Sequence, residues 1–245
     1  NSCNPYMIHL ALEMGNSRFA YYQSLFGFGK ITGIDLPGET TGIVYGDRMT
    51  TIDAACNSFG QTINVNMMQM MAAYCSIING GMLYQPHIVK RIESANGEVV
   101  KEYKANLVRQ TITASTSKLL RRYLKNTVEE GTAKKAGVTG YSVAGKTGTA
   151  QKGDRKDNKW IISFIGHAPA ENPKFAIYVV IDEPYGTTGT SGSSADVLTL
   201  THNILEKLLP YMNVYKDASD EYEDTSSSPD ELTVDGIPAG TASSN

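Results

Sequence analysis

The stretch Val143-Ala-Gly-Lys-Thr-Gly-Thr-Ala-Gln151 decides the fold of this chain. After a small apolar approach it places a cation, two hydroxyl groups and a glycine in succession: Lys146, Thr147, Gly148 and Thr149. On a strand, Thr147 and Thr149 leave on the same face. Gly148 has no Cβ, so a ligand backbone can approach it closely, and Lys146 offers a compact charge with three donors. The stretch therefore predicts a strand at the edge of a cleft.

Composition and charge narrow the class of protein. With 245 residues and 41% hydrophobic content, the chain can bury the core of one globular domain. A net charge of −3 argues against nucleic acid as a partner. The chain has three cysteines, an odd number, so we do not expect a full disulfide framework. The sequence contains no run of about 18 apolar residues, so we expect no membrane span within it.

Hydrophobic periodicity, caps and turn residues predict the order of the elements. The expected helices cover residues 5–14, 18–28, 51–57, 61–79, 116–129 and 195–209. The expected strands, besides the Lys146 stretch, cover residues 83–92, 99–104, 160–166 and 175–181. The first two of these strands flank a turn at Asn96-Gly97, which is a hairpin signal.

Further motifs accompany Lys146-Thr147-Gly148 in a fixed order. Ser2-Cys3-Asn4 forms an SxN triplet at the start of the chain. The remaining landmarks are Asp35–Glu39, Ser58–Gln61, Asn79–Gly81 with Pro86, Gly131–Ala133 and Phe164–Ala170. In this combination and order, the sequence resembles class B penicillin-binding proteins, the high-molecular-weight peptidoglycan transpeptidases. The resemblance covers roughly residues 1 to 212.

The resemblance implies a fold class and a domain organisation. The fold is α/β, the penicillin-binding/β-lactamase-like transpeptidase fold. It has a five-stranded, mainly antiparallel sheet flanked by helices, plus a helical subdomain. Residues 1–212 would be the C-terminal portion of the transpeptidase domain. Residues 213–245 are acidic and Ser-rich with few apolar groups, and we expect them to form a disordered tail.

The resemblance also implies a location. The sequence starts inside the SxN motif, so we expect the first part of the catalytic domain and a membrane anchor to lie upstream. The catalytic domain would then face outward from the bacterial cell membrane. The implied partners are peptidoglycan stem peptides, β-lactam antibiotics, the upstream remainder of the polypeptide and the cell-wall synthesis machinery.

The implied chemistry is acyl transfer through a serine ester at D-Ala-D-Ala. In the family, the nucleophilic serine and its lysine base belong to an SxxK motif upstream of SxN. Ser2 would relay a proton to the leaving nitrogen with help from Lys146, and Asn4 would bind the substrate amide. The hydroxyls of Thr147 and Thr149 would bind the terminal carboxylate, and the Thr149 N–H would donate to the oxyanion. No cofactor is required.

Two motif matches mislead. Ser115-Thr116-Ser117-Lys118 fits SxxK, but it lies between SxN and the Lys146 strand, which is the wrong order. A Ser/Thr run before an amphipathic helix is a capping sequence, and we interpret it so. Ser243-Ser244-Asn245 fits SxN within the polar tail.

Other functions of the same fold stay open. One alternative is a β-lactamase or a D,D-carboxypeptidase. The long segment 35–61 and the Gly-Thr-Ala triplet before Lys146 favour the large transpeptidases. The other alternative is a non-catalytic sensor or scaffold that binds β-lactam or wall peptide, and the upstream SxxK residues discriminate between these functions.

A structural zinc site is a further hypothesis. Asp53 and Cys56 are three residues apart and share a face of a helical turn. Cys3 lies in the SxN motif, and His167 lies at the end of the strand beside Lys146. One Asp, two Cys and one His form an ordinary tetrahedral zinc set. The alternative is four separate side chains, with Cys acting as a small hydrophobic residue.

Overall fold

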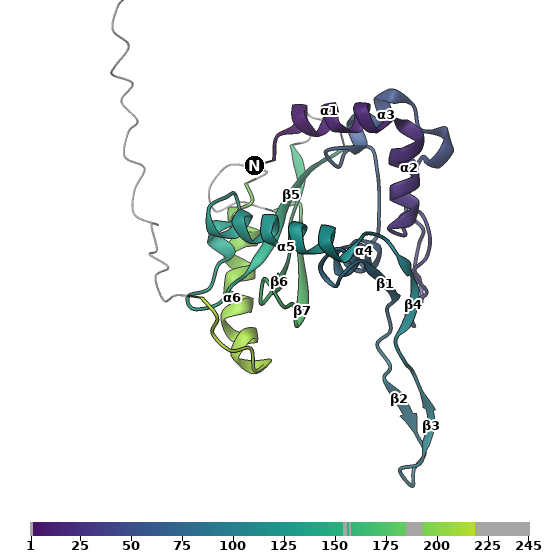
Figure 1. Cartoon of the computed structure of the whole chain (residues 1–245), viewed down its shortest axis with the longest axis vertical. Helices are drawn as coiled ribbons and strands as arrows, with labels where there is room; N and C mark the ends of the chain where they lie inside the picture. Colours follow the sequence, from purple (N-terminus) through teal and green to yellow (C-terminus); the bar gives the residue numbers. More distant parts are fainter. Residues whose placement is uncertain (1, 154–155, 157, 185–192, 219–245) are drawn as a thin grey trace, which may run out of the picture.

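The computed structural model describes residues 2–153, 156, 158–184 and 193–218. The elements divide into a helical part and a sheet part (Figure 1). The helical part contains α1 (Asn4–Met14), α2 (Asn16–Leu25), α3 (Thr51–Asn57) and α4 (Met67–Ile78). The sheet part contains β5 (Ala144–Lys152), β6 (Lys159–Ala168) and β7 (Phe175–Asp182), with α5 (Ala114–Glu129) and α6 (Ala195–Tyr211).

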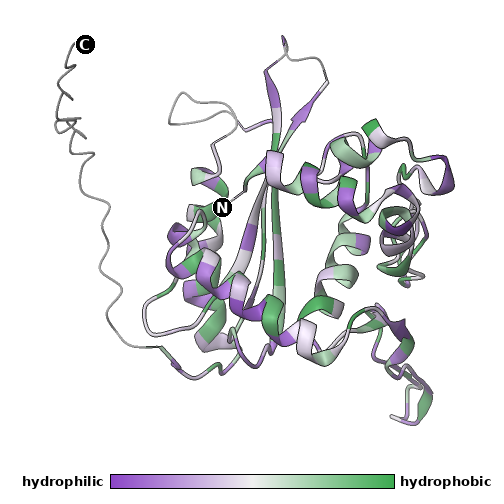
Figure 2. Cartoon of the chain, turned by 45° about the horizontal axis from the view of Figure 1, so that its top comes forward, coloured by the Kyte–Doolittle hydropathy of each residue, from purple (hydrophilic) through white to green (hydrophobic). Residues whose placement is uncertain are grey.

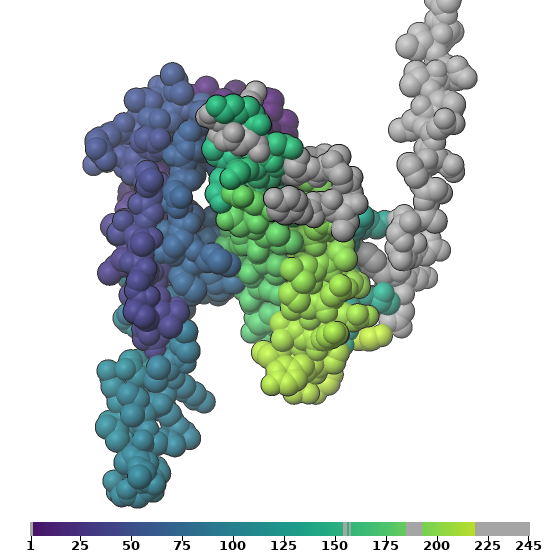
Figure 3. Space-filling model, turned by 180° about the vertical axis from the view of Figure 1, so that it is seen from behind, coloured from purple at the N-terminus to yellow at the C-terminus, as the bar shows by residue number. Residues whose placement is uncertain are grey.

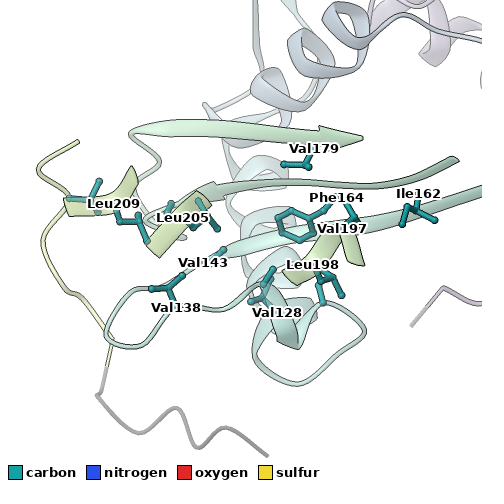
Figure 4. Packing of buried hydrophobic residues seen from close by; sticks show 14 residues of the cluster. Val128, Val138, Val143, Ile162, Phe164, Val179, Val197, Leu198, Leu205 and Leu209 are labelled. Atoms are coloured by element: carbon teal, nitrogen blue, oxygen red, sulfur yellow. The ribbon is translucent and has the colours of Figure 1, made fainter. Parts of the chain in front are cut away.

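The central sheet is antiparallel in the order β5-β6-β7. Its main core lies between one face of this sheet and the helices α5 and α6 (Figure 4). Ile162 and Phe164, both fully buried on β6, point toward α6 residues such as Val197. Side chains alternate along a strand, so Ser163, Ile165 and His167 leave on the other face, toward the helical part. These residues form the inner face of the sheet.

A pair of glycines accommodates the Phe164 ring at the centre of this core. Gly145 on β5 and Gly166 on β6 are register partners. A Cβ at either position would collide with the ring of Phe164. The close approach of two backbones and one aromatic ring therefore requires both glycines.

Caps set the limits of the helices in the helical part. Thr50 and Asp53 form a capping box at the start of α3, and Asn66 and Gln69 form another at the start of α4. The Gln69 side chain also donates to the backbone oxygens of Lys30 and Thr41, which ties α4 to the loop that follows α2.

A second structural feature extends away from the body of the molecule (Figures 1 and 3). Strand β1 (Met82–Gln85) pairs with β4 (Asn106–Gln110), and β2 (Arg91–Glu93) pairs with β3 (Val99–Glu102). The hairpin predicted around Asn96-Gly97 is therefore present. Every residue of β2 and β3 is exposed, and the extension contains both hydrophilic and hydrophobic residues (Figure 2).

Several predicted boundaries were wrong. The helix expected from residue 61 begins at Met67, because Thr62 has a positive φ of 60° and Asn64 pairs with Ile43 in a β-bridge. Strand β4 was not predicted. The helix expected at 18–28 runs from Asn16 to Leu25.

The α/β class is confirmed, but the strand count was wrong. The described residues form one three-stranded sheet and two two-stranded sheets rather than a single five-stranded sheet. The count of five was taken from the family resemblance. The strands predicted at 83–92 and 99–104 contribute to the two smaller sheets and not to the central one.

The start of the tail, predicted at residue 213, was placed too near the N-terminus. Val214 is 4% exposed and belongs to the main core, and Asp217 accepts hydrogen bonds from Ser142. The remaining residues of the predicted tail, 219–245, lie outside the described residues, as does the SxN match at 243–245. Within the part that is described, no helix has the length and apolar character needed to cross a membrane.

Candidate active site

The first and the central motifs of the sequence meet in space. The Nζ atom of Lys146 lies 2.6 Å from the Oγ atom of Ser2, 144 positions away in the sequence. Lys146 is the third residue of β5, and Ser2 directly precedes Cys3, the N-cap residue of α1. The contact therefore joins the sheet part directly to the helical part.

Lys146 is held by oxygen atoms in a partly buried position. Besides Ser2 Oγ, its Nζ donates to the backbone oxygen of Thr147 at 2.8 Å. Burial disfavours the charged ammonium and lowers the pKa of Lys146 below its ordinary value. A lysine with a lowered pKa gives up and regains a proton more readily near neutral pH, which suits it to a proton relay.

Thr147 connects β5 to the segment that follows α5. Its Oγ1 lies 3.5 Å from the Oγ1 of Thr132, and Ala133 beside it is fully buried in the main core. A Cβ at Gly131 would lie 2.8 Å from the backbone oxygen of Thr127, so a glycine is needed where the chain leaves α5. The Gly-Thr-Ala landmark thus places a second hydroxyl beside the Lys146 stretch.

Gly148 has a neighbour that explains the absence of a side chain. A Cβ there would lie 2.6 Å from the Oγ of Ser163, its register partner on β6. Thr149, the next residue, is exposed. Asn4 is also exposed, in the first turn of α1, two residues from Ser2.

The residues of the misleading SxxK match, 115–118, lie at the start of α5, where hydroxyl groups make capping contacts. Thr113 is the N-cap of α5, and its Oγ1 lies 2.9 Å from the hydroxyls of Ser115 and Thr116. The Oγ of Ser117 donates to the backbone oxygen of Ile77. The hydroxyls of Thr113, Ser115 and Thr116 therefore serve the start of α5, in agreement with the interpretation of this run as a cap, whereas Ser117 ties α5 to the end of α4.

The structure does not bring the predicted zinc ligands together. The Asp53 carboxylate accepts from the backbone and hydroxyl of Thr50, and both ring nitrogens of His167 are engaged by Tyr74 and Ala170. Cys3 is exposed at the start of α1, and Cys56 is partly buried in α3. Within the described ranges, no three His, Cys, Asp or Glu residues are grouped so that they could hold a metal ion.

Sequence reasoning missed a set of polar contacts on the side of the sheet that faces α4, buried at Tyr74, His167 and Ser142 and exposed at Asp217. Tyr74 and Ser142 carried no motif, and Asp217 lay in the presumed tail. The one feature of the sequence that could have indicated a docked segment there was Val214, an apolar residue shortly after the last helix.

Comparison with known proteins agrees with this geometry. A family model described as the penicillin binding protein transpeptidase domain matches residues 1–206. The chain belongs to the penicillin-binding protein transpeptidase domain family. The predicted resemblance is thereby confirmed.

Individual members of this transpeptidase family show how far the similarity extends. "Stage V sporulation protein D" of Bacillus subtilis is 41% identical over 219 residues, which are 87% of this chain and 34% of that protein. "Probable peptidoglycan D,D-transpeptidase PenA" of Neisseria meningitidis is 34% identical over 171 residues, 68% of this chain and 27% of that protein. The chain thus spans about a third of the length of the curated relatives it matches.

Solved structures of the transpeptidase family have the same fold. Penicillin binding protein 3 from Mycobacterium tuberculosis, complexed with aztreonam, superposes with a TM-score of 0.79 at 31% identity. The match covers 90% of this chain and 52% of that one. A complex of the same protein with ampicillin gives a TM-score of 0.77.

Proposed function

We propose that this chain is the C-terminal portion of a serine D,D-transpeptidase that crosslinks peptidoglycan stem peptides. The observation that carries the proposal is the 2.6 Å contact between Lys146 Nζ and Ser2 Oγ. In this family such a contact puts a hydroxyl and a lysine of lowered pKa beside the scissile bond. The names of relatives as peptidoglycan D,D-transpeptidases support the reaction class.

The first half of the reaction forms an ester. A serine from an SxxK motif, contributed by the rest of the polypeptide, attacks the carbonyl carbon between the two D-alanines. The attacking serine gives its proton to the lysine base of its own motif. The C–N bond breaks, the leaving nitrogen takes a proton from the Ser2 hydroxyl, and Lys146 returns a proton to Ser2. Asn4, two residues from Ser2, donates to or accepts from the substrate amide.

The second half of the reaction makes the crosslink. An amine from a neighbouring stem peptide attacks the ester carbonyl carbon, the C–O bond breaks, and the serine regains its proton. The N–H of the exposed Thr149 donates to the oxyanion in both halves. Loss of one such donor typically costs about 100- to 1000-fold in rate.

The terminal carboxylate of the substrate binds along β5. The hydroxyls of Thr147 and Thr149 donate to it, and the Lys146 cation stabilises its charge. Gly148 lets the peptide backbone lie close to the strand. β-Lactams carry an anionic group near their reactive carbonyl, a carboxylate in ampicillin and a sulfonate in aztreonam, and would acylate the same serine. Structures of a related protein complexed with aztreonam and with ampicillin support this assignment.

The location and the partners follow from the proposed substrate. Stem peptides lie outside the bacterial membrane, so the catalytic domain faces the cell envelope and works with the cell-wall synthesis machinery. We assign the anchor to the remainder of the polypeptide.

Fluorescent penicillin tests this function. The complete polypeptide should form a stoichiometric covalent adduct, whereas residues 1–245 alone should not, because the nucleophile lies outside them. Labelling of the isolated chain at Ser115 would overturn the assignment of that serine to the cap of α5. Ser115→Ala in the complete polypeptide is the matched control and should label at the parent rate.

The fate of the adduct separates the alternatives. Release of hydrolysed penicillin within minutes would identify a β-lactamase. Release of D-Ala from stem peptides without crosslinked product would identify a carboxypeptidase. An intact polypeptide that binds penicillin only reversibly would be a sensor or scaffold.

A further inference from the structure

A chain of hydrogen bonds runs beneath the sheet from α4 to the segment after α6. Its members are Tyr74, His167, Ala170, Ser142 and Asp217, which we call the linking network. The hydroxyl of Tyr74 lies 2.8 Å from His167 Nδ1, and His167 Nε2 lies 3.1 Å from the Ala170 oxygen. The Ala170 N–H donates to Ser142 Oγ at 3.0 Å. Both the hydroxyl and the N–H of Ser142 donate to the Asp217 carboxylate.

The direction of each bond follows from the groups involved. The Ala170 carbonyl only accepts, so His167 Nε2 carries the proton and Nδ1 accepts from Tyr74. His167 is fully buried, and burial lowers its pKa to about 4, so the ring is neutral at physiological pH. Every bond in the series then has one donor and one acceptor, and the series ends on an anion.

The linking network joins parts of the chain that are distant in sequence. Tyr74 belongs to α4 in the helical part, and His167 belongs to β6 in the sheet part. Ser142 lies two residues before β5, and Asp217 follows α6. The Tyr74–His167 bond is therefore a direct polar link between the two parts that also meet at Ser2 and Lys146.

The network lies close to Lys146 on the inner face of the sheet. His167 is the register partner of Ala144, and Ile165 is the register partner of Lys146. Lys146 thus lies one side-chain repeat beyond the His167 position, about 7 Å along the strand. Ser142 holds the backbone of the same strand just before Val143 and Ala144, which are both buried.

Polar groups at these positions restrict the arrangement more than apolar ones would. Apolar contacts tolerate a small sliding of α4 over the sheet, whereas buried hydrogen bonds lose their partners when the geometry shifts. An orphaned buried hydroxyl or ring nitrogen is costly, so the network favours one position of β5 relative to α4.

We propose that the linking network is a positioning device for Lys146, and that Tyr74, His167, Ser142 and Asp217 are positioning residues of the transpeptidase site. This inference rests on the function proposed above. By holding β6 against α4 and the approach to β5 in place, the network sets where the sheet carries Lys146 relative to the helical part that carries Ser2.

The test is Tyr74→Phe in the complete polypeptide, which removes one hydroxyl and keeps the ring. Tyr123→Phe is the matched control, since Tyr123 is 55% exposed on α5. Stopped-flow acylation by a β-lactam separates the acylation rate constant from the initial binding constant. A displacement of about 1 Å can cost up to about 100-fold in rate. We expect Tyr74→Phe to lower the acylation rate constant about 10-fold and to leave initial binding unchanged.

A second readout follows Lys146 itself. The pH dependence of its modification by an amine-reactive reagent, mapped by mass spectrometry, reports the pKa of Lys146. Tyr74→Phe should move this pKa toward its ordinary value, and Tyr123→Phe should not. A residue with a purely structural role would lower the melting temperature without moving the pKa or the acylation rate constant, and that result would overturn the proposal.

The other end of the network provides a graded series. Asp217→Asn keeps an acceptor for one Ser142 bond, and Asp217→Ala keeps none. The acylation rate constant should fall further for Ala than for Asn, and parent rates in both would overturn the proposal even if Tyr74→Phe fails to fold. Should the parent polypeptide fail to acylate, the proposed function fails, while the pKa of Lys146 still decides the positioning role.

Discussion

Lys146 Nζ and Ser2 Oγ are separated by 2.6 Å, and each is provided by a different part of the fold. Neither β5 nor the start of α1 forms the site alone. The geometry of the site therefore depends on how the helical part packs on the sheet. Substitutions can act on the site directly or through that packing.

The first prediction concerns the Lys146 charge. In the complete polypeptide, Lys146→Ala should slow acylation by penicillin about 100-fold, because it removes the cation and the donor to Ser2. Lys152→Ala is the matched control, since Lys152 lies on the same strand but pairs with Asp182 and Glu183 at the surface. Equal rates for parent and Lys146→Ala in a labelling time course would place the active site elsewhere.

The second prediction concerns the coupling of Ser2 to Lys146. If both residues serve one proton relay, Ser2→Ala should slow acylation by about the same factor as Lys146→Ala. The double variant should then be little slower than either single variant, because groups that act as a unit are not additive. Single-turnover kinetics of the four proteins completes this cycle. Multiplication of the two effects in the double variant would show that the residues act independently.

The third prediction concerns acid stability. The pKa of His167 is lowered from 6.5 to about 4 by burial, with a smaller contribution from the Arg121 cation. The unfolded state therefore binds a proton that the folded state does not bind, and stability is lost as the pH falls from 6.5 to 4. The loss should approach about 3 kcal/mol, and it should not increase further below pH 4 on account of this group.

Urea unfolding of the complete polypeptide between pH 7 and pH 4 measures that loss. The control is the double variant Tyr74→Phe with His167→Phe, which removes the titrating ring and the hydroxyl that it accepts from. It should lose about 3 kcal/mol less over the same range than the parent. A parallel decline in both proteins would mean that other groups cause the acid sensitivity.

The fourth prediction concerns the end of the chain. Removal of residues 219–245 leaves the contacts of Val214 and Asp217 in place, so the melting temperature should not change. Removal of residues 213–245 exposes the core beneath Val214 and frees Ser142, which should cost about 2 to 4 kcal/mol. Differential scanning calorimetry distinguishes the two truncations, and identical melting temperatures would show that the docked segment contributes nothing.

Local patterns predicted the elements wherever caps and alternation agree. The Ser/Thr run before the helix at 116–129 and the apolar run Trp160–Gly166 gave the right elements within a few residues. The helix placed from residue 61 failed because Ile63 fits the helical spacing while Asn64 pairs with Ile43. A β-bridge between residues 21 positions apart leaves no periodic signal in the sequence.

The site was predictable to the extent that it is written in motifs. Ser2, Lys146, Thr147 and Thr149 were singled out, and the structure brings Ser2 and Lys146 into contact. Distances between elements were not predictable from the sequence. This explains one false grouping and one missed contact, both of which involve His167. His167 was grouped with Cys and Asp residues that lie elsewhere, while its actual partner Tyr74, 93 positions away, carried no motif.

The 144-residue separation of Ser2 and Lys146 has a consequence for folding. A contact that closes so long a loop forms only after most of the intervening chain has been ordered, because the entropy of loop closure must be offset by the contacts inside it. The cleft is thus among the last features to form, and a partly folded chain has no site. A stem peptide held from both sides of the site binds only the folded state and raises the melting temperature, and this rise grows with the logarithm of the peptide concentration above its Kd.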